Sequence, residues 1–352
     1  MPTRSPLTAL FLGQALGDSL GLPAEGLSRE RIARLGWAGH WRQRLFFGKG
    51  FVSDDTEHLV LVAQALLESS DADSFQRRLA AGLRCWFLRL PAGIGFATLK
   101  ACLKLCLGVP AARAGVRSQG NGPAMRATLL GAVFADDAAK RRDYTLASTR
   151  LTHLDPAADT GALAIAEAAA ALVKGDSEEA LLLRLAQLGP DDRIWQERLA
   201  LIKQGRTEGW DLQGYCRAIS CENGVSGWIH ATVPVALYGL LSARDFKSGL
   251  SAVLDCGGDT DTVGAIAGAL LALRFGEASL PAEDLKALIE FPAGEAHLRA
   301  LAAALAGEGP APRLGLKALL YLPRQLLFTA IVLTHGLMRP ILALTAKART
   351  QP

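Results

Sequence analysis

The sequence predicts an all-α fold, a compact bundle of many helices. Half of the 352 residues are apolar, but only 6% are aromatic. Alanine and leucine, which favour helices, supply most of the apolar residues, while runs of β-branched residues are almost absent. Apolar residues recur at steps of three and four along most of the chain, which is the period of a helix with a buried face. Together these observations favour helices over strands.

Eight segments show this period most clearly. In chain order they span residues 56–70, 74–90, 97–108, 124–135, 162–175, 178–189, 194–205 and 263–276. Gly, Pro and Asp residues stand between them, as expected where helices start and stop. In the last segment, Gly264 and Gly268 are one turn apart, so a second helix can approach its backbone closely. No Gly/Ser-rich linker divides residues 1–308, which we interpret as one domain.

Residues 309–352 have a different composition. Six of the 38 Lys and Arg residues lie after Glu308 and none of the 34 acidic residues does, so residues 1–308 carry 32 basic and 34 acidic side chains. The net charge of +4 therefore comes from the tail, and the body lacks the dense basic stripe that nucleic-acid binding requires. No nucleic-acid partner is expected.

The tail also has a long uncharged run, from Gln325 to Met338, which is shorter than a membrane span. We expect a basic, apolar helical extension. The sequence leaves three placements open, namely a helix pair docked on the body, a contact with a partner and a segment on a membrane surface.

The first 21 residues combine one arginine with a short apolar run, which superficially resembles a secretory signal. Asp18 and the glycines after it are more typical of a structured turn. We therefore expect a cytoplasmic protein.

Two segments carry more acid than the start of a helix needs. The first comprises Ser53, Asp54, Asp55 and Thr56, and the second comprises Asp259, Thr260, Asp261 and Thr262. Taken alone, each is explained as a helix N-cap. Adjacent buried carboxylates repel, however, and a shared divalent cation removes that cost. Carboxylates and hydroxyls form an all-oxygen ligand set that suits Mg²⁺ or Mn²⁺, and one carboxylate can bridge two such ions.

Other segments are candidates for a ligand pocket beside these acids. Residues 118–126 form a glycine-bracketed loop that opens a helix, and such a loop either binds a phosphate or is a plain turn. Glu25 lies in a glycine-rich loop, and His153 precedes a helix, where a histidine is commonly a cap or surface residue. The basic and aromatic segment 36–50 either lines the pocket entrance or is a surface loop with buried Trp and Phe.

In this order the motifs GDSLGLPAE, VSDDTEH, GNGPAMR, LTH and CGGDTDTVGAIAGA resemble those of the ADP-ribosylglycohydrolase family. The resemblance covers residues 17 to about 270 and leaves out the tail. It implies an orthogonal all-α bundle with a binuclear Mg²⁺ or Mn²⁺ centre at helix N-termini. It also implies hydrolysis of the N- or O-glycosidic bond between ADP-ribose and an acceptor, which is a protein side chain or a small molecule.

Residue roles follow from the same resemblance. It implies metal ligation by Ser53, Asp54, Asp55, Asp259, Asp261 and Thr262. It implies substrate binding by Ser118, Gly120, Asn121, Gly122 and His153, the first four around the diphosphate. Glu25 matches an acidic residue over the bound ribose, so Glu25 and Asp55 are the candidate catalytic residues. Ser53 stands where many relatives have threonine, and Gln119 where some have an aromatic ring, which weakens the case for stacking there.

Three alternatives share some of these features. Class I isoprenoid synthases are all-α and use Mg²⁺, but their D-D-x-x-D motif ends here at His58. Haloacid-dehalogenase phosphatases carry D-x-D after an early buried strand, whereas the second acidic segment lies late in a helical chain. A non-catalytic ADP-ribose-binding or crystallin-like relative is expected to lose its acidic ligands, and here all of them are present.

Overall fold

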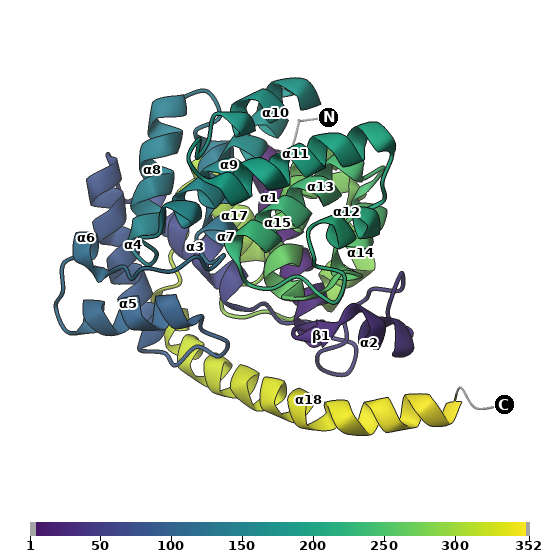
Figure 1. The fold of residues 1–352 in the computed structure, drawn as a ribbon. Coiled ribbons are helices and arrows are strands. Elements are labelled where there is room, and N and C mark those ends of the chain that lie inside the picture. Colours follow the sequence, from purple (N-terminus) through teal and green to yellow (C-terminus); the bar gives the residue numbers. More distant parts are fainter. Residues whose placement is uncertain (1–4, 350–352) are drawn as a thin grey trace.

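The structure, a computed structural model, describes residues 5–349 and the side chains as far as Leu337. Within this part of the chain there are eighteen α-helices, three short 3-10 helices and one pair of two-residue strands (Figure 1). The predicted all-α class is therefore confirmed.

Each of the eight periodic segments contains a helix. These are α3 (Asp54–Leu67), α4 (Ala72–Phe87), α5 (Phe96–Cys106), α7 (Ala124–Val133), α9 (Pro156–Lys174), α10 (Glu178–Ala186), α11 (Arg193–Glu208) and α15 (Thr260–Phe275). Ser or Asp side chains cap the N-termini of several of them, including α3, α9 and α11.

The structure adds helices that periodicity does not reveal. They are α1 (Pro6–Gly21), α2 (Arg29–Arg34), α6 (Ala111–Ala114), α8 (Ala138–Arg150), α12 (Leu212–Ala218), α13 (Ile229–Ser242), α14 (Phe246–Leu254), α16 (Ala282–Ala287), α17 (Glu295–Leu305) and α18 (Tyr321–Arg349). Helices α1 and α13 are buried on almost all sides, so they have no polar stripe to mark a period. Asp18 lies within α1 rather than in a turn, which corrects the interpretation from sequence.

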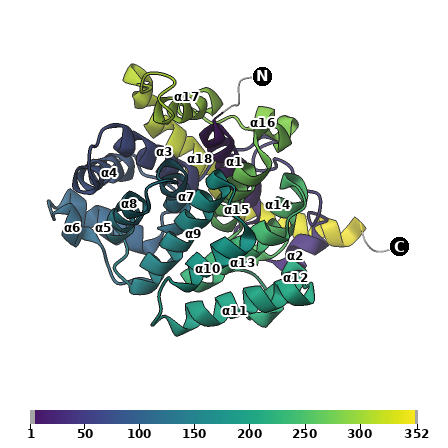
Figure 2. The same cartoon turned by 90° about the horizontal axis from the view of Figure 1, so that it is seen from above.

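Helices α1 and α15 lie side by side at the centre of the molecule (Figure 2). Their backbones touch through glycines, because a Cβ atom at Gly17 would lie 1.9 Å from the carbonyl oxygen of Gly264. A Cβ atom at Gly268 would lie 2.2 Å from the carbonyl oxygen of Gly13. Any larger side chain would force the helices apart. The close approach expected at Gly264 and Gly268 is thus present, and its partner is α1.

Two helical segments within residues 5–337 are long and apolar enough to resemble membrane spans. Pro156–Lys174, which is α9, is 72% buried inside the molecule and forms part of the core. Gly315–Leu337 is only 22% buried and belongs to the C-terminal extension.

The extension begins with a 3-10 helix, η3 (Gly315–Leu320), and continues as α18, one unbroken helix rather than a helix pair. In Figure 1, α18 runs along the underside of the body. Its Arg324 side chain is fully buried, and Nη2 donates a 2.7 Å hydrogen bond to the Val52 carbonyl. The start of α18 is therefore docked on the body. The domain boundary at residue 308 stays a prediction.

Candidate active site

The first acidic segment is held at the centre of the molecule by a residue of α1. Ser53 is the N-cap of α3, and its hydroxyl accepts a hydrogen bond from the Asp55 N–H at 3.2 Å. The fully buried Asp18 carboxylate accepts bonds from the N–H of Ser53 at 2.9 Å and from the N–H and hydroxyl of Thr56 at 3.1 and 2.5 Å. Asp18 therefore takes up donors at the N-terminus of α3 and fixes where that helix starts.

The second acidic segment is placed by a tight backbone arrangement before α15. The strand β2 (Gly257–Gly258) pairs antiparallel with β1 (Leu27–Ser28), so the Glu25 loop lies beside the start of α15. Gly257 and Gly258 have φ angles of 73° and 86°, which favour glycine. A Cβ atom at Gly258 would also lie 2.1 Å from the Val225 carbonyl oxygen. The two glycines thus allow the segments around Leu27, Val225 and Gly258 to pack together directly before Asp259.

Direct hydrogen bonds join the two acidic segments and the glycine-bracketed loop. The Thr262 hydroxyl donates to Asp55 Oδ2 at 3.2 Å, which links α15 to α3. Asn121 Nδ2 donates to Asp259 Oδ2 at 2.6 Å and to the Thr232 hydroxyl at 2.9 Å. Segments more than one hundred residues apart in sequence therefore form one connected polar centre.

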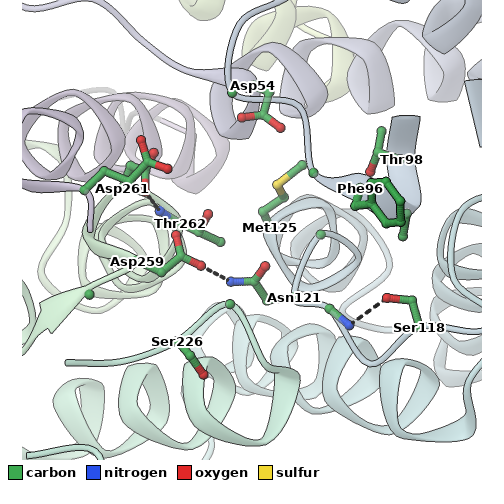
Figure 3. A pocket seen from close by; sticks show the side chains of 18 of the residues that line it. Asp54, Phe96, Thr98, Ser118, Asn121, Met125, Ser226, Asp259, Asp261 and Thr262 are labelled. Atoms are coloured by element: carbon green, nitrogen blue, oxygen red, sulfur yellow. Dashed lines mark hydrogen bonds between the residues drawn. The ribbon is translucent and has the colours of Figure 1, made fainter. Parts of the chain in front are cut away.

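These segments line a pocket of about 590 Å³. Figure 3 shows Asp54 on one side of it, Asp259, Asp261 and Thr262 on another, and Asn121 and Ser118 below. Ten of the twelve predicted site residues line this pocket, namely Glu25, Asp54, Ser118, Gly120, Asn121, Gly122, His153, Asp259, Asp261 and Thr262. The other two, Ser53 and Asp55, are buried directly behind it. The segment 36–50 is not among the lining residues.

The acidic residues destabilise one another's deprotonated, charged forms. Burial raises the pKa of Asp54, Asp55 and Asp261 well above the usual range, and neighbouring carboxylates raise it further. Burial also raises the pKa of Asp18 to about 7, against the opposing effect of its hydrogen bonds. Within residues 5–337, no Lys or Arg forms an ion pair with any of these four or with Asp259.

The chemistry of this set fits a divalent metal. The side chains of the two acidic segments offer only oxygen donors, and Asp55 Oδ1 is buried without a hydrogen-bond partner. A divalent cation would offset both the mutual repulsion and the unsatisfied oxygen. As the described side chains stand, however, no three His, Cys, Asp or Glu residues converge on a single point. Assignment of the individual ligands therefore stays a prediction.

His153 lies beside the glycine-bracketed loop that lines the pocket, and it is uncharged near neutral pH. Burial, with a contribution from the Arg126 charge, lowers its pKa to about 3. Its Nδ1 is 2.8 Å from the Thr152 hydroxyl, which in turn accepts a 2.7 Å bond from Arg126. A Cβ atom at Gly120 would lie 3.0 Å from His153 Nε2, so the small loop residue leaves room for the imidazole.

The pocket also contains residues that sequence reasoning missed. Phe96, Thr98, Met125 and the segment 225–227 line it, and Phe96 is 70% exposed. Asp18 does not line the pocket but holds the N-terminus of α3, where it accepts hydrogen bonds from Ser53 and Thr56. An acidic residue inside an otherwise apolar stretch was the one available signal for Asp18. The loop before α5 and the segment 225–227 carry no local pattern that predicts a site.

Comparison with known proteins gives consistent results. The family model described as ADP-ribosylglycohydrolase matches residues 2–314. An uncharacterised protein of Archaeoglobus fulgidus is 33% identical over 271 residues, 74% of this chain and 84% of that protein. The ADP-ribosyl-(dinitrogen reductase) glycohydrolase of Rhodospirillum rubrum is 25% identical over 285 residues, 79% of this chain and 88% of that protein. A solved structure, an ADP-ribosylglycohydrolase-related protein complex, has a TM-score of 0.63 at 25% identity and covers 87% of this chain and 98% of its own.

Proposed function

The chain belongs to the ADP-ribosylglycohydrolase family, and from this premise we propose that it is a divalent-metal-dependent hydrolase of ADP-ribose conjugates. The bond cleaved is the N- or O-glycosidic bond between the distal ribose and an acceptor. Family membership supports hydrolysis of a glycosidic bond in ADP-ribose conjugates. The proposal adds the dependence on divalent metal and the roles of individual residues.

One observation carries the metal dependence. Five aspartates from α1, α3 and the start of α15 gather behind and around one pocket, and no basic side chain in residues 5–337 pairs with them. Buried carboxylates without cations are costly, so such a cluster is stable in its charged form only with cations from solution. Two Mg²⁺ or Mn²⁺ ions suit an all-oxygen site of this charge.

In this proposal Ser53, Asp54, Asp55, Asp259, Asp261 and Thr262 hold the ions. The bound ions would polarise the attacking water and the ribose hydroxyls. Asp55 lies behind the pocket, bonded to Ser53 and Thr262, which supports a holding role as well as the proton-relay role predicted for it. The Asn121 amide fixes the orientation of the Asp259 carboxylate.

The glycine-bracketed loop is proposed to bind the diphosphate. The N–H groups of Gly120 and Asn121 already donate within the protein, to the Ser118 hydroxyl at 3.2 Å and the Gly227 carbonyl at 2.9 Å. The remaining contributions are then the Ser118 hydroxyl as donor, the backbone of Gly122 and the N-terminus of α7, whose dipole favours an anion. Uncharged His153 would add a hydrogen bond rather than a charge. The exposed ring of Phe96 offers an apolar surface for a flat group such as adenine.

Glu25 is proposed to orient the water and move its proton. It lines the pocket on the loop that β1 ties to Gly258, next to Asp261. As the acceptor leaves, the anomeric carbon gains positive charge, and the surrounding carboxylates stabilise it. The acceptor itself is left to experiment.

The proposal is tested by incubating the protein with ADP-ribosylated arginine, ADP-ribosylated serine and small ADP-ribosides, with Mg²⁺ or Mn²⁺ and with EDTA. We expect release of ADP-ribose from at least one conjugate, and no release in EDTA. Hydrolysis that is unaffected by EDTA contradicts the metal dependence, and no hydrolysis of any conjugate under any condition contradicts the enzyme assignment.

Two substitutions separate metal binding from turnover. Asp261→Asn should lower divalent-ion affinity at least about tenfold, as measured by calorimetry. Glu25→Gln should keep the ions but reduce turnover by about 10²–10⁴-fold, because it removes a proton-transfer group. Asp73→Asn, in an exposed part of α4, is the matched control and should change neither quantity. If Glu25→Gln loses the ions instead, Glu25 belongs among the metal ligands.

A further inference from the structure

One apolar face of α18 is left uncovered. As far as Leu337, the side chains that α18 buries against the body are Arg324, Gln325, Phe328 and Ile331. Four leucines lie on the opposite side, because a helix turns about 100° per residue and they are spaced at i, i+4, i+11 and i+15. They are Leu322, Leu326, Leu333 and Leu337, with exposed fractions of 45%, 55%, 62% and 78%. Packing on the body does not explain a row of leucines on the outer face.

The same segment carries positive charge without negative charge. No Asp or Glu occurs after Glu308, and Arg313 and Lys317 are exposed at the start of the extension. A helix with an apolar face and basic flanks is suited to the headgroup region of a bilayer, where leucines insert and basic side chains meet lipid phosphates. Two copies pairing through this face would bring like charges together. Charge therefore favours an anionic surface over self-association.

A second exposed apolar group lies beside α18. Phe46 and Lys49 close a tight turn whose tip residue, Phe47, has a φ of 46° and is 92% exposed. The preceding Leu45 packs in one apolar cluster with Phe328 and Ile331 of α18. Arg42 and Lys49 are exposed on or just before this turn, while Glu283 and Asp284 of α16 lie beside Arg42 and Gly48. The turn therefore adds an exposed apolar tip next to the helix, and the positive charge of the proposed surface comes from the extension itself.

The inner face of α18 determines how the helix would meet a bilayer. Arg324 bonds to Val52 and pairs with Glu290, and Gln325 Nε2 donates to Glu57 Oε1 at 2.6 Å. A bilayer crossing would break all of these buried contacts. A helix that keeps them lies along the membrane surface with the body still attached.

We propose that the outward face of α18 docks this protein on a bilayer surface rich in anionic lipids. The leucine row inserts at the level of the headgroups, and the basic residues of the extension supply the preference for negative charge. This inference is independent of the proposed reaction, since none of these leucines lines the pocket.

The test uses the full chain with vesicles of phosphatidylcholine alone and of phosphatidylcholine with phosphatidylglycerol, followed by sedimentation. We expect binding to the anionic vesicles, weakened by high salt. Leu333→Glu should reduce it about tenfold, because it removes an inserted side chain and adds a repelled charge. The matched control is Leu183→Glu, at a position that is 65% exposed on α10, a helix drawn on the side of the body away from α18 in Figure 1; it should bind like the parent.

Three results would overturn the proposal. The first is that the full chain binds neither kind of vesicle. The second is that Leu333→Glu and Leu183→Glu bind alike. The third is a dimer in solution that Leu333→Glu dissociates while vesicle binding is absent, which would assign the leucine row to a second copy of the chain. Circular dichroism of both variants checks that the fold is retained.

Discussion

Two groups of buried and half-buried carboxylates meet at the start of α3, and the described part of the chain supplies a basic partner to only one of them. Glu57 and Glu290 lie 3.1 and 2.5 Å from the guanidinium of Arg324. Asp54, one turn away, lines a pocket shared with the start of α15, and Asp55 is buried behind it; no basic residue in the described part of the chain pairs with either. The fold therefore supplies its own cation where the carboxylates are structural. Where they surround a pocket, the proposed function assigns their neutralisation to metal ions from solution.

The largest effect on stability is expected when Arg324, the basic partner of Glu57 and Glu290, is replaced. Arg324→Met leaves Glu57 and Glu290 without the positive charge that neutralises them, so the free energy of unfolding should fall by about 3–5 kcal/mol. Denaturant unfolding measures it, and Arg313→Met, at an exposed site, should change stability by no more than about 0.5 kcal/mol. Equal stability of the two variants would mean that the pair is not structural.

Neutralising one carboxylate in each group should have opposite effects on the metal-free protein. Glu290→Gln weakens charged hydrogen bonds to Arg324 and should lower stability by about 1.5–3 kcal/mol. Asp54→Asn relieves repulsion from Asp18 and Glu57 and should raise stability by about 1 kcal/mol in EDTA. The same sign for both changes, in thermal or denaturant unfolding, would contradict the distinction between the two groups.

The stability of the metal-free protein should also depend on pH, because the aspartates at the pocket have raised pKa values. In the folded metal-free protein, the pKa of Asp18 is raised to about 7 and that of Asp54, Asp55 and Asp261 is raised well above its usual range. The folded state thus binds protons that the unfolded state releases near pH 4, so stability falls as pH rises through the folded pKa values. The lowered pKa of His153 acts in the opposite direction, but only below its ordinary value near 6.5.

The melting temperature in EDTA should therefore fall between about pH 6.5 and 8. Saturating Mg²⁺ or Mn²⁺ should reduce this fall, because the ions bind the deprotonated carboxylates. Asp54→Asn should show a smaller slope than the parent. A melting temperature that rises with pH over this range in EDTA would show that the carboxylates are already neutralised within the protein.

The sequence was most informative where local chemistry and position coincide. Amphipathic periods predicted eight helices, and the acidic segments were recognisable because they exceed what capping requires. Gly264 and Gly268 also predicted a close helix contact, since one residue type alone permits it. The partner helix, α1, was not predictable, because a helix buried on all sides has no period.

The remaining parts of the site depend on tertiary contacts. Asp18 reaches the start of α3 through the packing of α1 against α3, and the pairing of Leu27 with Gly258 involves strands of two residues. Phe96 enters the pocket as the first residue of α5, without any distinctive motif. The role of Arg324 was also hidden, since a basic residue in a basic tail gives no sign that it pairs with Glu290.

The most direct test of the central claim is diffraction from crystals grown with Mn²⁺, recorded where manganese scatters anomalously. We predict two anomalous peaks between the N-terminus of α3 and that of α15, within bonding distance of carboxylates from both acidic segments, and none beside Glu57 and Glu290. If crystals at saturating Mn²⁺ show well-ordered electron density for both acidic segments but no anomalous peak between Asp54 and Asp261, the account is contradicted.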